Sequence, residues 1–415
     1  MFEKIVRTIT GVALTIWLAR HLGPEKFGLY SYATAFVALL GSAAGLGLHG
    51  IVVRQLVNEP EKRGQILGTS GVLMTLSGAF SFSTILGLTL LFQTDDTRDF
   101  GLIAIIGATV LFKGSEIAIY WFEYQVLSKY IVWAQSIILI FFTLFKMLII
   151  YAFNSLIHLS FLIFLEALIL AITLLIILFY RGLGLKKLTF ACSQAKYLLG
   201  QSWPLLLSTI SILVYLKVDQ IMIGQIIDRY NVGIYSSAVR VSEAIYFLPV
   251  IVMASIFPAI AKLKNENPEK FRMTFQKTFD LMVLLSFLVI AVFYFFSSFV
   301  IKTLYGPSYF EAILVLKIHI LAVIFVFLGV ASGKWFLIEN LQIFLLRRAL
   351  LGAVLNIVLN LVLIPSHGIH GAAIATVLSY ASADFLSDLL SAKTRPLFLM
   401  KIRAFYLINS VKRLS

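Results

Sequence analysis

The sequence has little charge for its length: Asp, Glu, Lys and Arg make up only 13% of its 415 residues, whereas 60% are hydrophobic. A soluble globular domain carries about 25% charged residues, so the shortfall excludes a chain whose surface mainly faces water. A helix needs roughly 20 apolar residues to cross a bilayer. About twelve such helices account for nearly all of the length, and the composition therefore predicts an all-α membrane protein without a separate soluble domain.

Cysteine and catalytic motifs are also scarce. The single cysteine, Cys192, excludes an intrachain disulfide. The chain has no Gly-x-Ser-x-Gly motif, no ATP-binding signature and no pair of acids in a large aqueous loop. His367 and His370 flank a turn, but two histidines without a third ligand make a poor metal site. We therefore expect no enzyme: no catalytic residues, no metal site and no cofactor.

Long apolar stretches define the membrane spans. Residues 137–144 are continuously apolar, unlike the alternating strands of a membrane barrel. A basic stretch at 261–278 is expected to be a loop. The predicted spans are 5–22, 28–53, 66–92, 100–124, 130–153, 157–180, 203–227, 233–260, 279–304, 311–337, 343–364 and 371–390.

Basic residues alternate in number from one side of these spans to the other. One side, with both termini, holds 23 Lys and Arg residues, and the opposite side holds 5. The positive-inside rule places the first side in the cytoplasm. This distribution explains the net charge of +14 without nucleic acid. It predicts an even number of spans and two cytoplasmic termini.

Two short motifs recur in the second half of the chain. The segment 28–33 (GLYSYA) is similar to 233–238 (GIYSSA), and Trp121-Phe122 to Trp335-Phe336, at equivalent positions among six spans each. Chance similarity in a biased composition is the alternative. Because six is even, the repeats would be parallel, as in some transporters. We expect an N-terminal six-helix lobe at 1–190 and a C-terminal lobe with a cytoplasmic tail at 191–415, around a central cavity.

Ionisable residues inside spans usually line a cavity or form pairs, because each costs about 2.5–3.5 kcal/mol at the bilayer centre. Lys113 with Glu116 and Arg240 with Glu243 have i,i+3 spacing and could neutralise each other as packing pairs. The excess of cations favours an anionic ligand. The predicted substrate-binding residues are Lys113, Lys146, Lys217, Arg240, Lys317 and Arg7, and the predicted ion-coupling residues are Glu116, Asp219 and Glu243.

Three segments resemble a known family. They are 18–33 (LARHLGPEKFGLYSYA), 219–235, which opens with DQIMIG and ends with VGIY, and 368–376 (GIHGAAIAT). They are similar to segments of bacterial polysaccharide flippases of the Wzx (O-antigen) type, in the multidrug/oligosaccharidyl-lipid/polysaccharide exporter superfamily. The resemblance covers almost the whole chain. The short N-terminus and the twelve spans depart from relatives that have fourteen.

The resemblance implies transport of a polyprenyl-pyrophosphate-linked oligosaccharide from the cytoplasmic to the outer leaflet, as in O-antigen and lipopolysaccharide synthesis. It implies alternating access, coupling to a proton or sodium ion, and contact with membrane lipid and polysaccharide assembly proteins, but not with nucleic acid. A drug/ion antiporter of the same superfamily is the alternative, for which an acidic cavity would suit cationic drugs. A membrane glycosyltransferase or polymerase is a third reading, which would need catalytic acids or a large outer loop.

Overall fold

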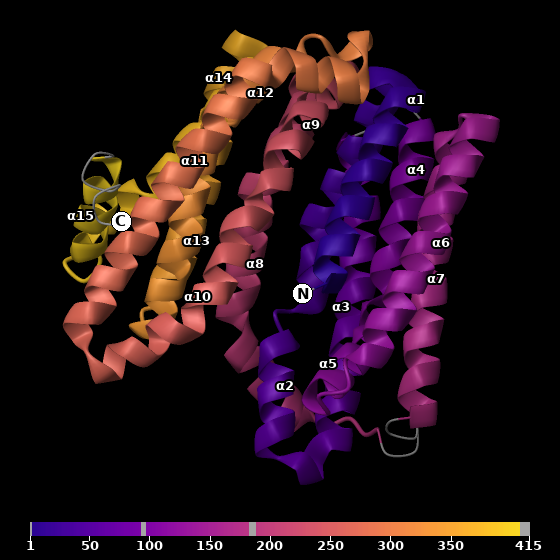
Figure 1. Cartoon of the computed structure of the whole chain (residues 1–415). Coiled ribbons are helices and arrows are strands. Elements are labelled where there is room, and N and C mark those ends of the chain that lie inside the picture. Colours follow the sequence, from indigo (N-terminus) through magenta and orange to yellow (C-terminus); the bar gives the residue numbers. More distant parts are fainter. Residues whose placement is uncertain (1, 93–96, 182–187, 407–415) are drawn as a thin grey trace. The chain divides into compact units, whose positions relative to one another are not determined.

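A computed structural model of the chain describes residues 2–92, 97–181 and 188–406. Every regular element in these ranges is helical (Figure 1). Ten helical segments of the described chain are long and apolar enough to cross a membrane. They are Thr10–Asn58, Pro60–Leu91, Asp99–Tyr124, Lys129–Phe153, Leu156–Arg181, Cys192–Ile226, Arg229–Glu266, Pro268–Tyr305, Ala312–Ile338 and Ile343–Leu390.

The first and last of these segments each contain a reversal of the chain. Helix α1 (Phe2–Gly41) is broken at Gly23 (φ 75°, ψ 169°), and α14 (Ile343–Asp384) is broken at Gly368 (φ 59°, ψ −141°). Glycine adopts positive φ without the steric cost that a side chain brings. Both breaks fall where the sequence predicted turns between spans. The all-α membrane fold is confirmed, and dividing each of the two broken segments at its glycine gives twelve passes.

The chain forms two compact units, Met1–Lys217 and Val218–Ser415, which are called unit 1 and unit 2 below. Unit 1 begins with α1 and ends within α8 (Cys192–Ile226). Its core gathers side chains from α2, α3, α5, α7 and α8 around the buried Trp121 and Phe122. The intervening elements are η1 (Ser42–Gly45), α2 (His49–Asn58), η2 (Pro60–Lys62), α3 (Arg63–Phe92), α4 (Thr97–Gly107), η3 (Ala108–Glu116), α5 (Ile117–Tyr124), α6 (Lys129–Phe153) and α7 (Leu156–Arg181).

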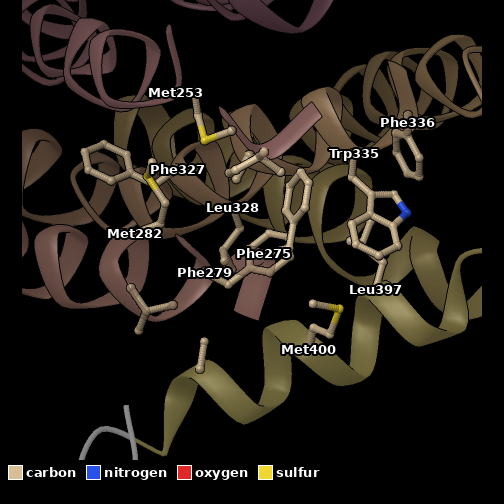
Figure 2. Close-up of a cluster of buried hydrophobic side chains, with 14 of the residues drawn as sticks. Met253, Phe275, Phe279, Met282, Phe327, Leu328, Trp335, Phe336, Leu397 and Met400 are labelled. Atoms are coloured by element: carbon tan, nitrogen blue, oxygen red, sulfur yellow. The ribbon is translucent and has the colours of Figure 1, made fainter. Parts of the chain in front are cut away.

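Unit 2 packs its helices around a second apolar core. Figure 2 shows Met253, Phe275, Phe327 and Trp335 in this cluster, with Met400 approaching it from α15. The last helix therefore belongs to the core of unit 2. After α8, the elements are α9 (Arg229–Glu243), η5 (Ala244–Tyr246), α10 (Phe247–Glu266), α11 (Pro268–Tyr305), η6 (Pro307–Tyr309), α12 (Ala312–His319), α13 (Ala322–Ile338), α14, η7 (Leu386–Leu390) and α15 (Arg395–Phe405).

The prediction of a loop at 261–278 is wrong. Helix α10 continues to Glu266, α11 begins at Pro268, and only Asn267 separates them with extended backbone (φ −155°, ψ 93°). The Asn267 side chain caps α11 by accepting a hydrogen bond from the Lys270 amide at 2.9 Å. The basic residues of this stretch therefore lie on helix ends, which hydropathy alone cannot distinguish from a loop.

The two units repeat the same irregularities. The Trp-Phe pair is buried in the core of each unit, at Trp121-Phe122 and at Trp335-Phe336. The second span of each unit is interrupted by a short 3₁₀ segment, and the fourth span is interrupted near its middle. These interruptions are η1 in the second span, η5 in the eighth, η3 in the fourth and residues 320–321 in the tenth.

The two arms of α14 approach closely just beyond the break at Gly368. A Cβ atom placed on Gly371 would lie 2.1 Å from the Leu363 carbonyl oxygen, and backbone atoms cannot yield as a flexible side chain can. We therefore expect Gly371→Ala to force the arms apart and to lower the melting temperature in detergent by several degrees. Gly333→Ala is the matched control, since its Cβ would meet nothing closer than Leu345 Cδ2 at 3.9 Å. Equal melting temperatures for both variants would contradict this prediction.

Candidate functional site

A buried carboxylate lies near the end of α8 in unit 2. Asp219 is only 2% exposed. Its Oδ2 accepts hydrogen bonds from the Tyr235 hydroxyl of α9 and, at 3.2 Å, from the Thr376 hydroxyl of α14. Its Oδ1 accepts from the Gln220 backbone amide at 2.8 Å. Residues from three helices therefore build one carboxylate site, which we define as Asp219, Tyr235 and Thr376.

A histidine supports this site from α12. The ring of His319 meets that of Tyr235 edge-on, with centroids 6.4 Å apart. Its Nδ1 lies 2.7 Å from the Ser242 hydroxyl, which also lies 3.0 Å from the Val239 carbonyl oxygen. Either His319 Nδ1 or the Ser242 hydroxyl can donate in this hydrogen bond, depending on the tautomer of the ring. This bond fixes the ring against Tyr235.

Two buried asparagines lie on the other arm of α14. Asn360 Nδ2 donates to Asn356 Oδ1 at 3.1 Å, and both residues are fully buried. The arms meet at Leu363 and Gly371. A helix rises about 1.5 Å per residue, so Thr376 on the second arm lies roughly 7.5 Å along the helix from this contact. On the first arm, Asn360 lies roughly 4.5 Å and Asn356 roughly 10.5 Å from it. The asparagines thus bracket the depth of Thr376 in the membrane.

Part of the hydrogen-bonding capacity at this depth is unused. Within the described residues, Asn360 Oδ1 and Asn356 Nδ2 have no hydrogen-bond partner. Buried polar atoms are normally satisfied, and each exception calls for an explanation. A carboxylate, hydroxyls and an unused carboxamide oxygen are suitable groups to hold a proton or a small hard cation.

Two of the predicted cations of unit 1, Lys113 and Lys146, face carboxylates. Lys113 Nζ lies 2.6 Å from Glu116 Oε1 within η3, as their spacing predicted. Lys146 of α6 pairs with Glu166 of α7, and both side chains are largely buried. Since these pairs neutralise both lysines, each has a structural role in joining or ordering helices alongside its predicted role in substrate binding.

Unit 1 contains a polar cavity of about 450 Å³ beside the first of these pairs. It is lined by Lys113 and Glu116 from η3, by His49 from α2 and by residues of α5, α6 and α7. The His49 ring stacks on Tyr120 with centroids 5.0 Å apart, and its Nε2 lies 2.6 Å from Glu123 Oε2. Acids and bases balance in this cavity, so it does not favour an anion by charge alone.

Of the other predicted site residues, Glu243 lies within electrostatic range of the Tyr235 hydroxyl. Lys217 is half-buried on α8, as are Arg240 and Glu243 near the end of α9. Lys317 Nζ lies 5.3 Å from the ring centre of Tyr294, an arrangement typical of a cation–π contact. The side chain of Arg7 lies outside the described part of the structure.

Sequence reasoning identified Asp219 but not its partners. Tyr235 lies within the recurring GIY motif, and Thr376 ends the segment 368–376. The structure brings one residue from each of these family-like segments together with Asp219. Buried polar residues within family-like segments were therefore the available signal. Asn356, Asn360 and His319 carried no such signal.

Comparison with solved structures defines the class of this fold. A multidrug resistance MATE transporter of the MOP superfamily in an inward-facing conformation matches with a TM-score of 0.73 and 15% identity, over 97% of this chain and 96% of that one. The lipid II flippase MurJ matches with a TM-score of 0.73 and 13% identity, over 98% and 90%. A MOP superfamily transporter from Pyrococcus furiosus matches with 0.62 and 15%, over 98% and 93%. The chain is a multi-pass integral membrane protein with the fold of MOP superfamily transporters.

The sequence itself matches a family. Residues 4–264, well over half of the chain, match the family described as polysaccharide biosynthesis proteins. The chain belongs to that family. A curated relative, the "probable low-salt glycan biosynthesis flippase Agl15" of Haloferax volcanii, is 29% identical over 219 residues. That match covers 51% of this chain and 45% of the relative, so the chain spans about half the length of the curated relative that it matches.

Proposed function

We propose that the protein is a flippase that moves a polyprenyl-pyrophosphate-linked oligosaccharide from the cytoplasmic to the outer leaflet, and that it is not an enzyme. The family match over residues 4–264 carries the proposal. The Haloferax volcanii relative and MurJ are both named as flippases, which supports it. Moving a lipid-linked precursor breaks no covalent bond, so the function requires no catalytic residue.

The transported headgroup determines what the protein must supply. A bare pyrophosphate cannot enter hydrocarbon, because burying an unpaired ion is prohibitively costly. Half-buried basic side chains such as Lys217 and Arg240 would offset that cost while the polyprenyl tail remains in lipid. Rocking of the two repeated halves would expose the headgroup first to one side and then to the other.

We propose that transport is coupled to a proton or sodium ion at the carboxylate site. The buried Asp219, whose carboxylate accepts from Tyr235 and Thr376, supports this assignment. A buried acid inside a membrane span marks a functional site by default, because the cost of keeping it must be offset. Glu116 and Glu243 are further candidates for ion coupling. Glu116 is paired with Lys113, and Glu243 is half-buried on α9.

The orientation and location are also proposals. The 23 basic residues on one side against 5 on the other support cytoplasmic termini. We propose a bacterial plasma membrane, with the O-antigen of lipopolysaccharide as the glycan and polysaccharide assembly proteins as partners.

The function is tested in a strain that lacks the gene and makes a surface glycan. The wild-type gene should restore the glycan and clear its lipid-linked precursor. We expect Lys217→Ala and Arg240→Ala each to reduce translocation about tenfold or more, since a charge-assisted hydrogen bond contributes about 1.5–3 kcal/mol. Surface glycan and precursor are measured together.

Lys302→Ala is the matched control, because this exposed lysine lies in the last turn of α11 over the Phe310 ring and is not among the predicted site residues. Normal glycan in all three variants would remove Lys217 and Arg240 from the transport path. Unchanged precursor together with drug sensitivity in the deletion strain would instead favour the drug/ion antiporter, whose fold this chain shares.

A further inference from the structure

A second cavity, of about 620 Å³, lies at the basic end of unit 2. Its walls come from the last turns of α10, the first turns of α11, the end of α13 and α15. Four basic residues and one acid line it: Lys264, Arg272, Lys393, Arg403 and Glu339. This basic cavity, as we call it, is separate from the carboxylate site and has no part in the transport proposed above.

The single acid of the basic cavity is already neutralised. Lys264 Nζ lies 3.0 Å from Glu339 Oε2 and donates to the Ile338 carbonyl at 2.9 Å. The exposed side chains of Arg272, Lys393 and Arg403 then give the lining three net positive charges. Several cations gathered around one concave surface favour an anionic ligand.

The first turn of α11 adds to this potential. Its helix dipole carries partial positive charge, of which Asn267, by capping the Lys270 amide, and the acidic Glu269 already offset a part. Lys270 and Arg272 lie in its first two turns, where cations are disfavoured and anions are preferred. A bound anion at this end would satisfy both the dipole and the basic side chains.

The remaining surface of the basic cavity is apolar. Phe271, Trp335 and Met400 are buried in its wall, while Met273 and Leu399 are 58% and 54% exposed. A soluble phosphate would leave these exposed apolar groups uncovered. A phospholipid offers both parts, a phosphate for the cations and acyl chains for Met273 and Leu399.

We propose that the basic cavity binds the phosphate headgroup of an anionic phospholipid of the leaflet on the basic side of the membrane, with its acyl chains along Met273 and Leu399. Basic pockets between helix ends on the cytoplasmic side are suited to such headgroups, because that leaflet is rich in anionic lipid. The bound lipid joins α11 to α15 at the edge of unit 2.

The test compares lipid retention by the purified full chain. The protein is transferred to mixed micelles that contain phosphatidylglycerol or phosphatidylcholine, and bound lipid is counted by native mass spectrometry. Wild type should retain phosphatidylglycerol in preference to phosphatidylcholine. The double variant Arg272→Gln/Lys393→Gln should bind phosphatidylglycerol about 30-fold more weakly, since each basic residue contributes about fivefold to the affinity.

Lys262→Gln/Lys277→Gln is the matched control, since it removes the same charge from exposed residues of α10 and α11 that do not line the basic cavity. The control should retain phosphatidylglycerol like wild type. Equal retention by both double variants would overturn the site. A second arm adds inorganic phosphate and pyrophosphate, and displacement of the lipid at micromolar concentration of either would assign the cavity to a soluble anion instead.

Discussion

Asp219→Asn is expected to abolish ion-coupled transport and leave the fold intact. Asparagine has the size of aspartate, and its carboxamide oxygen can still accept from Tyr235 and Thr376, so that only the bond from the Gln220 amide is lost. It can neither bind a proton nor offer a negative charge to a sodium ion. Coupling between two bound species typically amounts to 5–150-fold, so we expect translocation driven by an ion gradient to fall by at least about tenfold.

Reconstituted vesicles with an imposed sodium or proton gradient provide the measurement, and Asp228→Asn provides the control. Asp228 caps α9 by accepting from the Asn231 amide at 2.7 Å, and asparagine caps equally well. The control therefore removes one acid close to the site without affecting coupling. Wild-type rates in Asp219→Asn under a gradient would show that this carboxylate does not couple transport to an ion.

A second variant distinguishes coupling to a proton from coupling to a sodium ion. A sodium ion needs several oxygen ligands, whereas a proton needs only the carboxylate. Thr376→Val removes one oxygen and keeps the shape of the side chain. If sodium binds, it should raise the melting temperature of wild type, since a ligand at 100 times its Kd stabilises by about 2.7 kcal/mol. Thr376→Val should then show a smaller rise in melting temperature with sodium than wild type does. If the protein is coupled to protons instead, sodium should leave the melting temperature of both wild type and Thr376→Val unchanged.

Much of the architecture could be predicted from the sequence because the bilayer constrains it so strongly. Only helices or closed barrels satisfy their backbone groups in lipid, and apolar lengths then locate the spans. The turns at Gly23 and Gly368 were predicted because glycine and polar residues interrupt two long apolar stretches there. The Trp-Phe pair that recurs in the sequence lies in the core of each unit.

The pairing of side chains could be predicted only where it is local. Lys113 and Glu116 pair within one turn, so their spacing sufficed. Lys146 and Glu166 lie on different helices, and Asp219 and Thr376 are 157 residues apart. Which faces of two helices meet depends on packing that hydropathy does not encode. The prediction of a loop at 261–278 was wrong for a related reason, because helices α10 and α11 continue beyond their apolar segments.

A buried network of charges attaches α15 to unit 2. Lys401 of α15 is fully buried, and its Nζ lies 2.7 Å from Asp388 Oδ2 of η7 and donates to the Asp384 carbonyl at 2.6 Å. Arg348 of α14 lies 2.8 Å from Asp384 Oδ1 and donates to the Ala383 carbonyl at 2.9 Å. Together these bonds connect both arms of α14 with η7 and α15.

Lys401→Met should destabilise unit 2 by about 3–5 kcal/mol, because it leaves Asp388 as a buried charge without its partner. Adding Asp388→Leu should recover much of that loss, since an apolar pair of similar volume is often as stable as a buried ion pair. Denaturant unfolding in detergent measures the two single variants and the double variant as a cycle. Similar stability of Lys401→Met and wild type would contradict the network.

The same lysine predicts how stability depends on pH. Burial lowers the pKa of Lys401 from 10.5 to about 8, against the opposing effect of Asp388. Between pH 8 and 10.5 the unfolded chain then binds more protons than the folded protein, so stability rises with pH by up to about 1.4 kcal/mol per unit. Below pH 8 both states are protonated, and the contribution is constant. Lys401→Met lacks this group, so the stability of wild type minus that of the variant should increase over this window alone. A difference that stays flat from pH 8 to 10.5 would mean that the buried ammonium keeps an ordinary pKa, and that its ion pair with Asp388 outweighs the cost of burying it.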